Sequence, residues 1–210
     1  MTKEIFIEEL KKLNIKLTEE QLEKLEKFYN LLIEWNEKIN LTRITEQEEV
    51  YLKHFYDSLT ITKVIELNKV ETLCDVGTGA GFPGIVLKIC YPNLKITLID
   101  SLLKRVNYLN EIIKKLELKD IKAIHTRGED FKEQFDVVTS RAVANIEKLL
   151  KYTMHLVNKN GQMIAMKGNI EEELTKSVEN KINKKYQIVN IEKFNLPIEE
   201  SKRSLVVIKK

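Results

Sequence analysis

Hydrophobic positions in the first third of the chain recur every three or four residues. This spacing is typical of amphipathic helices, which bury one face and leave the other in water. Thr18 followed by Gln21 is typical of a capping box at a helix start. No strand is predicted in this segment. The predicted helices cover 4–13, 18–39 and 46–54, with a further short one to about residue 65.

From residue 70 onward the pattern changes to short, strongly apolar runs separated by helical stretches. Runs of this length, rich in β-branched residues, predict strands. The seven candidate strands are 71–75, 95–99, 121–125, 135–139, 162–166, 186–194 and 204–209. The helical stretches between them are 83–90, 102–117, 145–156 and 170–182.

The order of these elements predicts the fold. Five strands that alternate with helices imply a parallel, right-handed, doubly wound sheet. Only residues 195–201 separate the last two strands, so these are expected to form an antiparallel hairpin at one edge. That layout is typical of class I S-adenosylmethionine-dependent methyltransferases, whereas a nicotinamide-binding domain usually has a sixth parallel strand. We therefore expect an α/β fold of this class with a seven-stranded sheet. Residues 1–66 would form a helical cap and 67–210 the methyltransferase domain, packed as one globular unit.

Composition excludes several classes of protein. The 210 residues suit one domain with an appendage. No apolar run approaches the roughly 18 residues of a membrane helix, and the N-terminus lacks the layout of a signal peptide. Cys74 and Cys90 do not have the spacing of metal ligands. We expect a cytoplasmic protein without a metal site and without contact with a membrane.

Charge is unevenly distributed along the chain. The net charge is +3, but residues 1–60 carry 9 basic and 13 acidic side chains, so the excess of positive charge lies in 61–210. Such an excess is compatible with a polyanionic partner, and equally with an ordinary lysine-rich surface. Only five of the basic residues are arginines, which can bind planar anions through two parallel hydrogen bonds. They are Arg43, Arg105, Arg127, Arg141 and Arg203.

The most informative segment is a glycine-rich turn between a predicted strand and a predicted helix. Gly77, Gly79 and Gly81 allow a tight turn to approach a ligand closely. The spacing from Gly79 to Gly84 satisfies the dinucleotide fingerprint, and Asp100 follows at the distance expected for a ribose-binding acid. The strand, the turn, the helix and the acid together predict a nucleotide-binding loop.

Ligands of such sheets bind outside the carboxyl ends of the strands. We therefore expect the site to be built from the residues that follow each strand. For an adenosine derivative, Asp100 would accept from the ribose hydroxyls, and Glu129 or Asp130 would lie near the adenine. Glu129 and Asp130 could equally be a solvated turn, and Lys167 one of many surface lysines. The residues at the five strand ends are Asp75 with Gly77–Gly81, Asp100, Thr126–Asp130, Ser140–Ala142 and Lys167–Gly168.

A series of motifs in fixed order points to one family. The motifs are Trp35-Asn36, Asn40-Leu41-Thr42, His54-x-x-Asp57-Ser58-Leu59, Asp75-Val-Gly-Thr-Gly-Ala-Gly-Phe-Pro-Gly84, Asp100-Ser101, Lys104-Arg105, Arg127-Gly128-Glu129, Ser140-Arg141-Ala142-x-Ala144 and Lys167-Gly168. The series spans 35–168 and resembles the RsmG (GidB) family. Members of that family methylate N7 of a guanosine in bacterial 16S ribosomal RNA. Gly128 departs from the family, which more often has alanine there.

The resemblance implies S-adenosyl-L-methionine as cofactor, and 16S ribosomal RNA or the small ribosomal subunit as partner. We expect a monomer without a metal. Cofactor contacts carry over to Gly77, Phe82, Gly128, Glu129 and Arg141. The strand-end argument adds Gly79 and Asp100. Arg141 and Lys167 are candidates for positioning the target.

Methylation at N7 makes few chemical demands on the protein. The N7 lone pair is available at neutral pH and carries no proton, so no general base is required. The fourth strand ends in Ser140-Arg141 rather than in the Asn-Pro-Pro-Tyr type of sequence that holds an exocyclic amine. We therefore expect catalysis by positioning and by exclusion of water. Arg141 would bind the cofactor and could approach O6 of the guanine, but a guanidinium on both O6 and N7 would block the acceptor.

His54, Asp57 and Ser58 lie too close in sequence to form a hydrolytic triad, so a structural or lid role at the mouth of the pocket is favoured. Two other classes of function remain open. An NAD-dependent oxidoreductase is supported only by the glycine spacing and Asp100. A non-catalytic ribosomal RNA-binding or assembly factor on a methyltransferase scaffold is disfavoured by the intact glycine loop.

Overall fold

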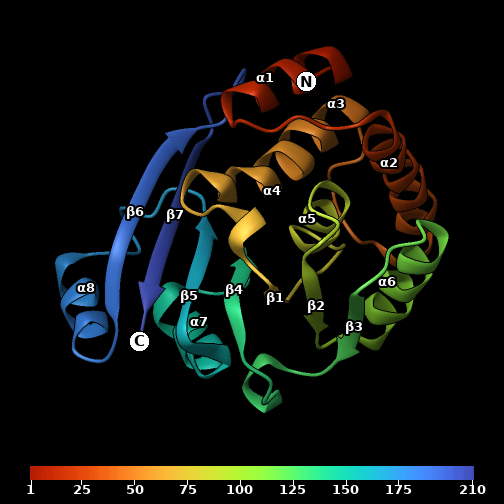
Figure 1. The fold of residues 1–210 in the computed structure, drawn as a ribbon. Coiled ribbons are helices and arrows are strands. Elements are labelled where there is room, and N and C mark those ends of the chain that lie inside the picture. Colours follow the sequence, from red (N-terminus) through yellow and green to blue (C-terminus); the bar gives the residue numbers. More distant parts are fainter.

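The computed structural model describes residues 1–210 and has a seven-stranded sheet at its centre (Figure 1). The strand order is β3-β2-β1-β4-β5-β7-β6. The first five strands pair in parallel, and β7 runs antiparallel between β5 and β6. This confirms the predicted doubly wound sheet with a terminal hairpin. The strands are β1 Thr72–Val76, β2 Lys95–Asp100, β3 Ile121–His125, β4 Phe135–Arg141, β5 Val157–Lys167, β6 Gln187–Asn195 and β7 Lys202–Lys209.

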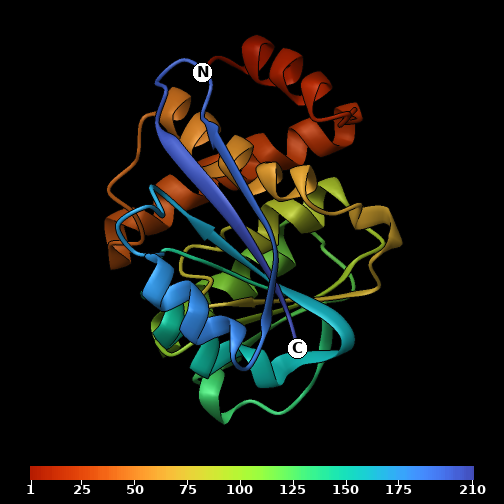
Figure 2. The same ribbon diagram turned by 90° about the vertical axis from the view of Figure 1, so that its left-hand side faces the viewer.

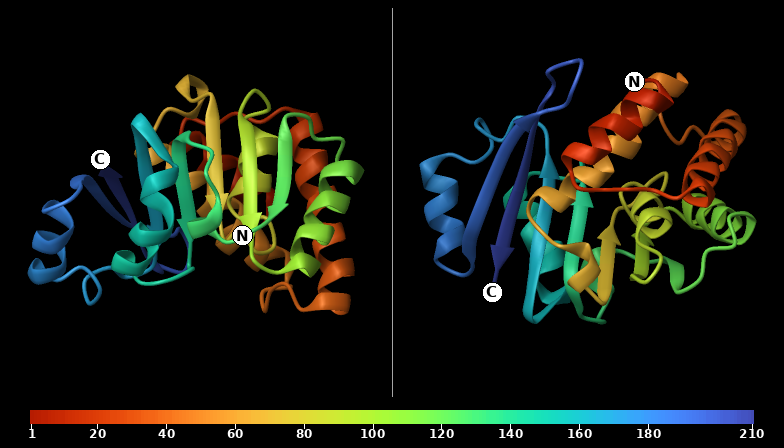
Figure 3. Two further views of the ribbon diagram at one scale, coloured as in Figure 1. Left: turned by 90° about the horizontal axis from the view of Figure 1, so that it is seen from below. Right: turned by 45° about the horizontal axis from the view of Figure 1, so that its top comes forward.

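Helices cover both faces of the sheet. They are α1 Lys3–Lys12, α2 Glu19–Ile39, α3 Gln47–Val50, α4 Asp57–Leu59, α5 Gly84–Cys90, α6 Leu103–Lys115, α7 Ile146–Thr153 and α8 Lys176–Asn183. Tyr51–Tyr56 continues α3 as a π-helical segment that leads into α4. Short 3-10 turns are Thr60–Lys63, Leu67–Lys69, Gly128–Asp130 and Met154–Leu156. Figure 3 shows the N-terminal helices gathered with α6, away from α8.

Two hydrophobic cores correspond to the two faces. The larger contains buried residues of α1 and α2 together with those of α5, α6 and the sheet, so the N-terminal helices and the sheet share one core. The smaller lies under α7 and α8. Thr18 accepts from the backbone of Gln21, whose side chain accepts in return, which confirms the predicted capping box.

Aromatic residues of the N-terminal helices anchor the glycine loop. The ring of Phe82 lies 5.4 Å from that of Phe28 on α2 and 6.2 Å from that of Phe55. Phe28 and Phe55 are fully buried, and aromatic packing of this kind adds to the free energy gained from burial alone. The cap therefore fixes the end of the loop that leads into α5.

The structure differs from the predicted elements in two places. The helix predicted over 170–182 begins only at Lys176, where the Thr175 side chain caps it by accepting from Val178 N. The preceding residues form a turn instead, because the Glu173 carboxylate is bound to Lys167 and to the backbone N–H of Ile146. Strand β5 also begins at residue 157, five positions earlier than predicted. No helix of the structure is long and apolar enough to cross a membrane.

Candidate active site

The glycine loop turns sharply between β1 and α5. Gly77, Gly79 and Gly81 have φ of +71°, +61° and +96°, which other residues rarely adopt. A Cβ placed on Gly79 would meet no atom closer than 4.0 Å, so the loop borders open space at this position. A Cβ on Gly84 would lie 2.2 Å from Leu98 Cδ2, so Gly84 allows α5 to pack against β2. Gly79 thus leaves room for a ligand, whereas Gly84 leaves room for the core side chain of Leu98.

Asp75 braces this loop from inside. Its Oδ2 accepts from Thr78 Oγ1 at 2.7 Å and from Gly84 N at 2.9 Å. The residue is fully buried, and burial raises the pKa of its carboxyl to about 6. Oδ1 is buried without a partner. Asp75, one of the strand-end residues named above, thus holds the loop together through Thr78 and Gly84.

Asp100 at the end of β2 lies against the same loop. It is 3 % exposed, and Oδ2 accepts from Gly79 N at 3.0 Å while Oδ1 accepts from Leu102 N at 2.9 Å. Arg105 Nη1 lies 3.5 Å from Oδ2. The structure therefore places Asp100 beside Gly79, at the edge of the sheet where the sequence predicted a ribose-binding acid.

A cavity of about 210 Å³ opens next to Asp100. It brings together Gly77, Asp100, Gly128 and Glu129, four of the predicted cofactor residues. Asp130 does not line it. Its other lining residues are Val76, Ile99, Ser101, Thr126, Arg127, Val143 and Tyr152.

Gly128 is tightly packed in this cavity wall. A Cβ there would lie 2.9 Å from Val76 Cγ1 and 3.0 Å from the carbonyl oxygen of Tyr152. Glycine therefore lets the 3-10 turn approach β1 and α7 more closely than alanine does without a local shift. The departure from the family pattern therefore changes the packing behind the turn.

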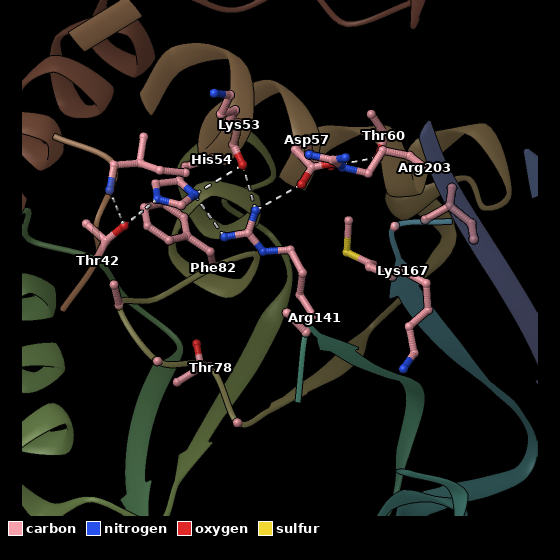
Figure 4. Close-up of a pocket in the computed structure, with 18 of the residues that line it drawn as sticks. Thr42, Lys53, His54, Asp57, Thr60, Thr78, Phe82, Arg141, Lys167 and Arg203 are labelled. Carbon is pink, nitrogen blue, oxygen red and sulfur yellow. Dashed lines mark hydrogen bonds and ion pairs between the residues drawn. The ribbon is translucent and has the colours of Figure 1, made fainter. Parts of the chain in front are cut away.

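A second cavity of about 400 Å³ lies between the N-terminal helices and the carboxyl ends of the strands (Figure 4). It contains five of the predicted site residues: Gly77, Gly79, Phe82, Arg141 and Lys167. Gly77 lines both cavities, and a Cβ on it would lie 2.5 Å from Val143 Cγ2. The glycine loop thus connects the two cavities, with Val143 packed over the connection.

Arg141 reaches from β4 to the cap. Nη1 donates to Asp57 Oδ2 at 3.0 Å and to the carbonyl of Lys53 at 2.9 Å, and Nη2 donates to His54 Nδ1 at 3.1 Å. The guanidinium also lies 5.3 Å from the centre of the Phe82 ring. A guanidinium has five N–H donors, so these contacts leave Nε and one hydrogen of Nη2 for a ligand.

His54 is a neutral acceptor in this network. Burial and the charge of Arg141 lower its pKa to about 3. Arginine can only donate, so Nδ1 accepts and the ring proton is on Nε2, which lies 3.0 Å from Thr42 Oγ1. The ring stacks on Phe82 with centroids 4.4 Å apart. His54 therefore orients both Arg141 and the loop residue Phe82.

Lys167 points away from Arg141 and toward the loop after β4 (Figure 4). Its Nζ donates to the carbonyl of Ala144 and to Glu173 Oε1, the latter at 3.0 Å. Glu173 Oε1 also accepts from Ile146 N. Lys167 and Glu173 together hold the loop that carries Val143 over the glycine loop.

Sequence reasoning missed Arg203 on β7 and the backbone of Lys53 as parts of the site. Arg203 Nε donates to Asp57 Oδ1 at 3.1 Å, so Asp57 binds Arg141 with one oxygen and Arg203 with the other. The rarity of arginine in this chain was the only signal for Arg203. No group of three or more His, Cys, Asp or Glu side chains is arranged to hold a metal ion.

The residues present fit S-adenosylmethionine. A Cβ at Gly79 would extend into open space beside the loop, so this space is available to a ligand. The smaller cavity offers the carboxylates of Asp100 and Glu129 as hydrogen-bond acceptors. The larger cavity offers the two unused donors of Arg141 as partners for an anionic group. The two cavities meet at Gly77 and thus suit an elongated ligand with different groups at its two ends.

Two solved structures with a similar fold are methyltransferases. The chain superposes on a SAM-dependent methyltransferase from Aquifex aeolicus with a TM-score of 0.59 at 18% identity, over 79% of this chain and 94% of that one. Superposition on precorrin-6y C5,15-methyltransferase from Geobacter metallireducens gives a TM-score of 0.55 at 16% identity, over 80% and 90% of the two chains. These likenesses confirm the class I methyltransferase fold.

Sequence relatives agree on the family. The family described as "GidB: rRNA small subunit methyltransferase G" matches residues 21–206. A protein of Bacillus subtilis (strain 168) named ribosomal RNA small subunit methyltransferase G is 45% identical over all of this chain and 91% of its own length. The protein of the same name from Oceanobacillus iheyensis is 46% identical over the same shares. Fold and family together support a SAM-dependent methyltransferase with S-adenosylmethionine as cofactor, and the chain belongs to the GidB family of ribosomal RNA small subunit methyltransferases G.

Proposed function

We propose that this protein transfers the methyl group of S-adenosylmethionine to N7 of a guanosine in 16S ribosomal RNA. The family supports the RNA substrate, and the chemistry of the larger cavity supports a ring nitrogen as acceptor. The observation that carries the choice of N7 is that the two candidate bases in this cavity, His54 and Asp57, are already engaged.

Neither candidate base is suited to remove a proton from an amine. His54 Nδ1 accepts from Arg141, and with a pKa of about 3 the ring has little affinity for a further proton at neutral pH. Both oxygens of Asp57 are bound to guanidinium groups. A guanine N7 needs no deprotonation, so a site without a free base is sufficient for it.

The side chains of this protein act by binding and orienting the cofactor and the target nucleoside. When bound, the cofactor supplies an electrophilic sulfonium methyl group. Asp100 and Glu129 would hold its adenosine part from the smaller cavity, and the free donors of Arg141 would hold its methionine carboxylate. His54 and Asp57 fix Arg141, and stacked Phe82 helps to exclude water beside the glycine loop.

Three further statements belong to this proposal. The protein acts as a monomer, it works in the cytoplasm where small ribosomal subunits are assembled, and residues 1–66 serve as a cap on the catalytic unit 67–210. The core shared by the N-terminal helices and the sheet supports the last of these. Light scattering at micromolar concentration tests the first, since a mass near twice 24.6 kDa would contradict it.

Methyl transfer provides the direct test. Purified protein, labelled S-adenosylmethionine and small subunits from a strain without this gene should give one labelled guanosine, identified as N7-methylguanosine by mass spectrometry. Calorimetry should show saturable binding of S-adenosylhomocysteine and none of NAD. Cofactor binding without transfer to the subunits would favour a non-catalytic assembly factor, and saturable binding of NAD alone would favour an oxidoreductase.

A further inference from the structure

The β6–β7 hairpin brings an arginine and an aromatic ring to the rim of the larger cavity. Arg203 and Phe194 are directly paired across the two strands, so their side chains lie on the same face of the hairpin. Both line the larger cavity. In Figure 2 the hairpin runs up to the N-terminal helices, and its tip is joined to them by an ion pair of 3.1 Å between Glu199 and Lys53. The hairpin therefore forms one wall of the cavity entrance.

Arg203 is held in place from inside. Asp57, whose side chain is 7% exposed, accepts from Nε at 3.1 Å, and the Lys202 carbonyl accepts from Nη1 at 3.0 Å. These contacts use two of the five N–H donors and leave one hydrogen of Nη1 and both of Nη2. The guanidinium is thus oriented by a buried carboxylate and keeps three donors at the rim.

A second cation lies over the ring of Phe194. Lys63 Nζ is 5.0 Å from the centre of the Phe194 ring, a cation–π contact that holds an otherwise flexible, exposed ammonium near the same wall. Lys63 forms no ion pair within the chain. Arg141 and Arg203 share the carboxylate of Asp57 and Lys63 has no carboxylate partner, so these four side chains together carry a net charge of +2.

We propose that Arg203 and Lys63, which both lie beside Phe194, bind the backbone phosphate of the RNA nucleotide that enters the larger cavity. This inference rests on the proposed function and adds the place where the RNA strand is held. Three free guanidinium donors and an unpaired ammonium suit a phosphate, and an arginine binds it with fixed geometry. A phosphate held at this wall would fix the target nucleoside beside the glycine loop before transfer.

Two substitutions test the phosphate subsite while each leaves at least one cation in it. Arg203→Lys keeps the charge next to Asp57 but loses the planar fork, and Lys63→Gln removes one exposed charge. Both should raise KM for small subunits about tenfold, and Lys63→Gln, which lines neither cavity, should keep kcat and the affinity for S-adenosylhomocysteine within twofold of wild type. Lys63→Gln should also lower the slope of log KM against log salt by about 0.7, the value for one lost phosphate contact on a single strand. Lys159→Gln, an exposed lysine at the opposite end of β5, is the matched control and should change neither quantity.

The outcomes separate the two proposals. If wild type methylates subunits while Arg203→Lys and Lys63→Gln have the KM and salt slope of the control, the phosphate subsite is wrong and the proposed function stands. A loss of cofactor affinity in Arg203→Lys equal to its loss in KM would also overturn the subsite, because the arginine would then act only through Asp57. If wild type transfers no methyl group, the proposed function is wrong. The subsite is then tested by comparing the affinities of wild type, the two variants and the control for small subunits in a direct binding assay.

Discussion

Arg141 Nη1 donates to Asp57 Oδ2 at 3.0 Å, although the two residues are 84 positions apart in the sequence. The first belongs to the sheet and the second to the cap, and both side chains are largely buried. Asp57 also binds Arg203, so one carboxylate joins the cap to β4 and β7. The cap therefore helps to orient Arg141 in the larger cavity.

Removing this carboxylate should destabilise the protein. Asp57→Ala would leave two guanidinium groups in a buried site without an anion, a change that typically costs about 3–5 kcal/mol. Urea unfolding followed by the fluorescence of Trp35, the single tryptophan, measures the difference. Glu34→Ala breaks an exposed ion pair with Lys38 and should cost less than about 1 kcal/mol. Equal effects of the two substitutions would show that Asp57 does not hold the arginines together.

The neutral state of His54 predicts a dependence of stability on pH. Its folded pKa of about 3 is below the unfolded value of about 6.5, so the unfolded chain takes up the proton first as pH falls. The contribution is complete above pH 6.5 and is lost progressively toward pH 3, on the order of 5 kcal/mol in total. His54→Gln should therefore unfold more easily at pH 7.5 but lose less stability than wild type between pH 7 and pH 5.

Exposed His125 provides the control for this measurement. His125→Gln should leave the difference in unfolding free energy between pH 7 and pH 5 as it is in wild type. If His54→Gln shows the same pH dependence as wild type, His54 is not the neutral acceptor described above. The pH dependence of stability has to be compared between variants, because Asp75 changes the stability with pH in the opposite direction. Its raised folded pKa stabilises the protein below the unfolded value of about 3.8, and this contribution is lost as pH rises through about 6.

The two ends of the glycine loop should respond differently to alanine. Gly79→Ala places a methyl group in open space at a φ of +61°, which costs roughly 1–2 kcal/mol and obstructs the ligand. Gly84→Ala brings a Cβ within 2.2 Å of Leu98 Cδ2, and overpacking of this kind costs about 1–3 kcal/mol. Calorimetry with S-adenosylhomocysteine should show strongly reduced binding for a folded Gly79→Ala. Wild-type affinity in that variant would contradict the placement of the cofactor along the loop.

Asp100→Asn should weaken cofactor binding about tenfold, because an amide is a poorer acceptor than a carboxylate for ribose hydroxyls and for Gly79 N. The dissociation constant of S-adenosylhomocysteine measures this effect. Glu111→Ala changes an exposed acid on α6, outside both cavities, and serves as the control. Unchanged affinity in Asp100→Asn would remove this residue from the site.

The sheet could be predicted from the sequence because each strand is a short apolar run and the alternation with helices allows few topologies. The turn at 170–174 could not be predicted, because it depends on the contact between Glu173 and Lys167 rather than on local propensity. Helical periodicity continued through these residues in the sequence. A tertiary contact prevailed over that periodicity.

Site residues could be predicted from the sequence only where they lie at the carboxyl end of a parallel strand. Gly77 follows β1 directly, and Asp100 and Arg141 are the last residues of β2 and β4, so the geometry of a parallel sheet brings all three to one edge. Arg203 arrives from an antiparallel strand and meets Asp57 across 146 positions, a pairing that no spacing indicates. The side-chain direction of Lys167 was equally beyond reach, because it is decided by the carbonyl of Ala144 and by Glu173.

Lys167 and Glu173 should act as a pair in positioning the loop over the cofactor. Lys167→Met and Glu173→Gln each release one side of the contact that holds Ala144 and Ile146, so Val143 is no longer fixed over Gly77. Each should weaken S-adenosylhomocysteine binding about fivefold to tenfold. The double variant should be no worse than either alone, with a coupling energy of about 1–2 kcal/mol. Lys159→Met is the control for loss of a lysine, and additive effects in the double variant would mean that the two side chains act independently.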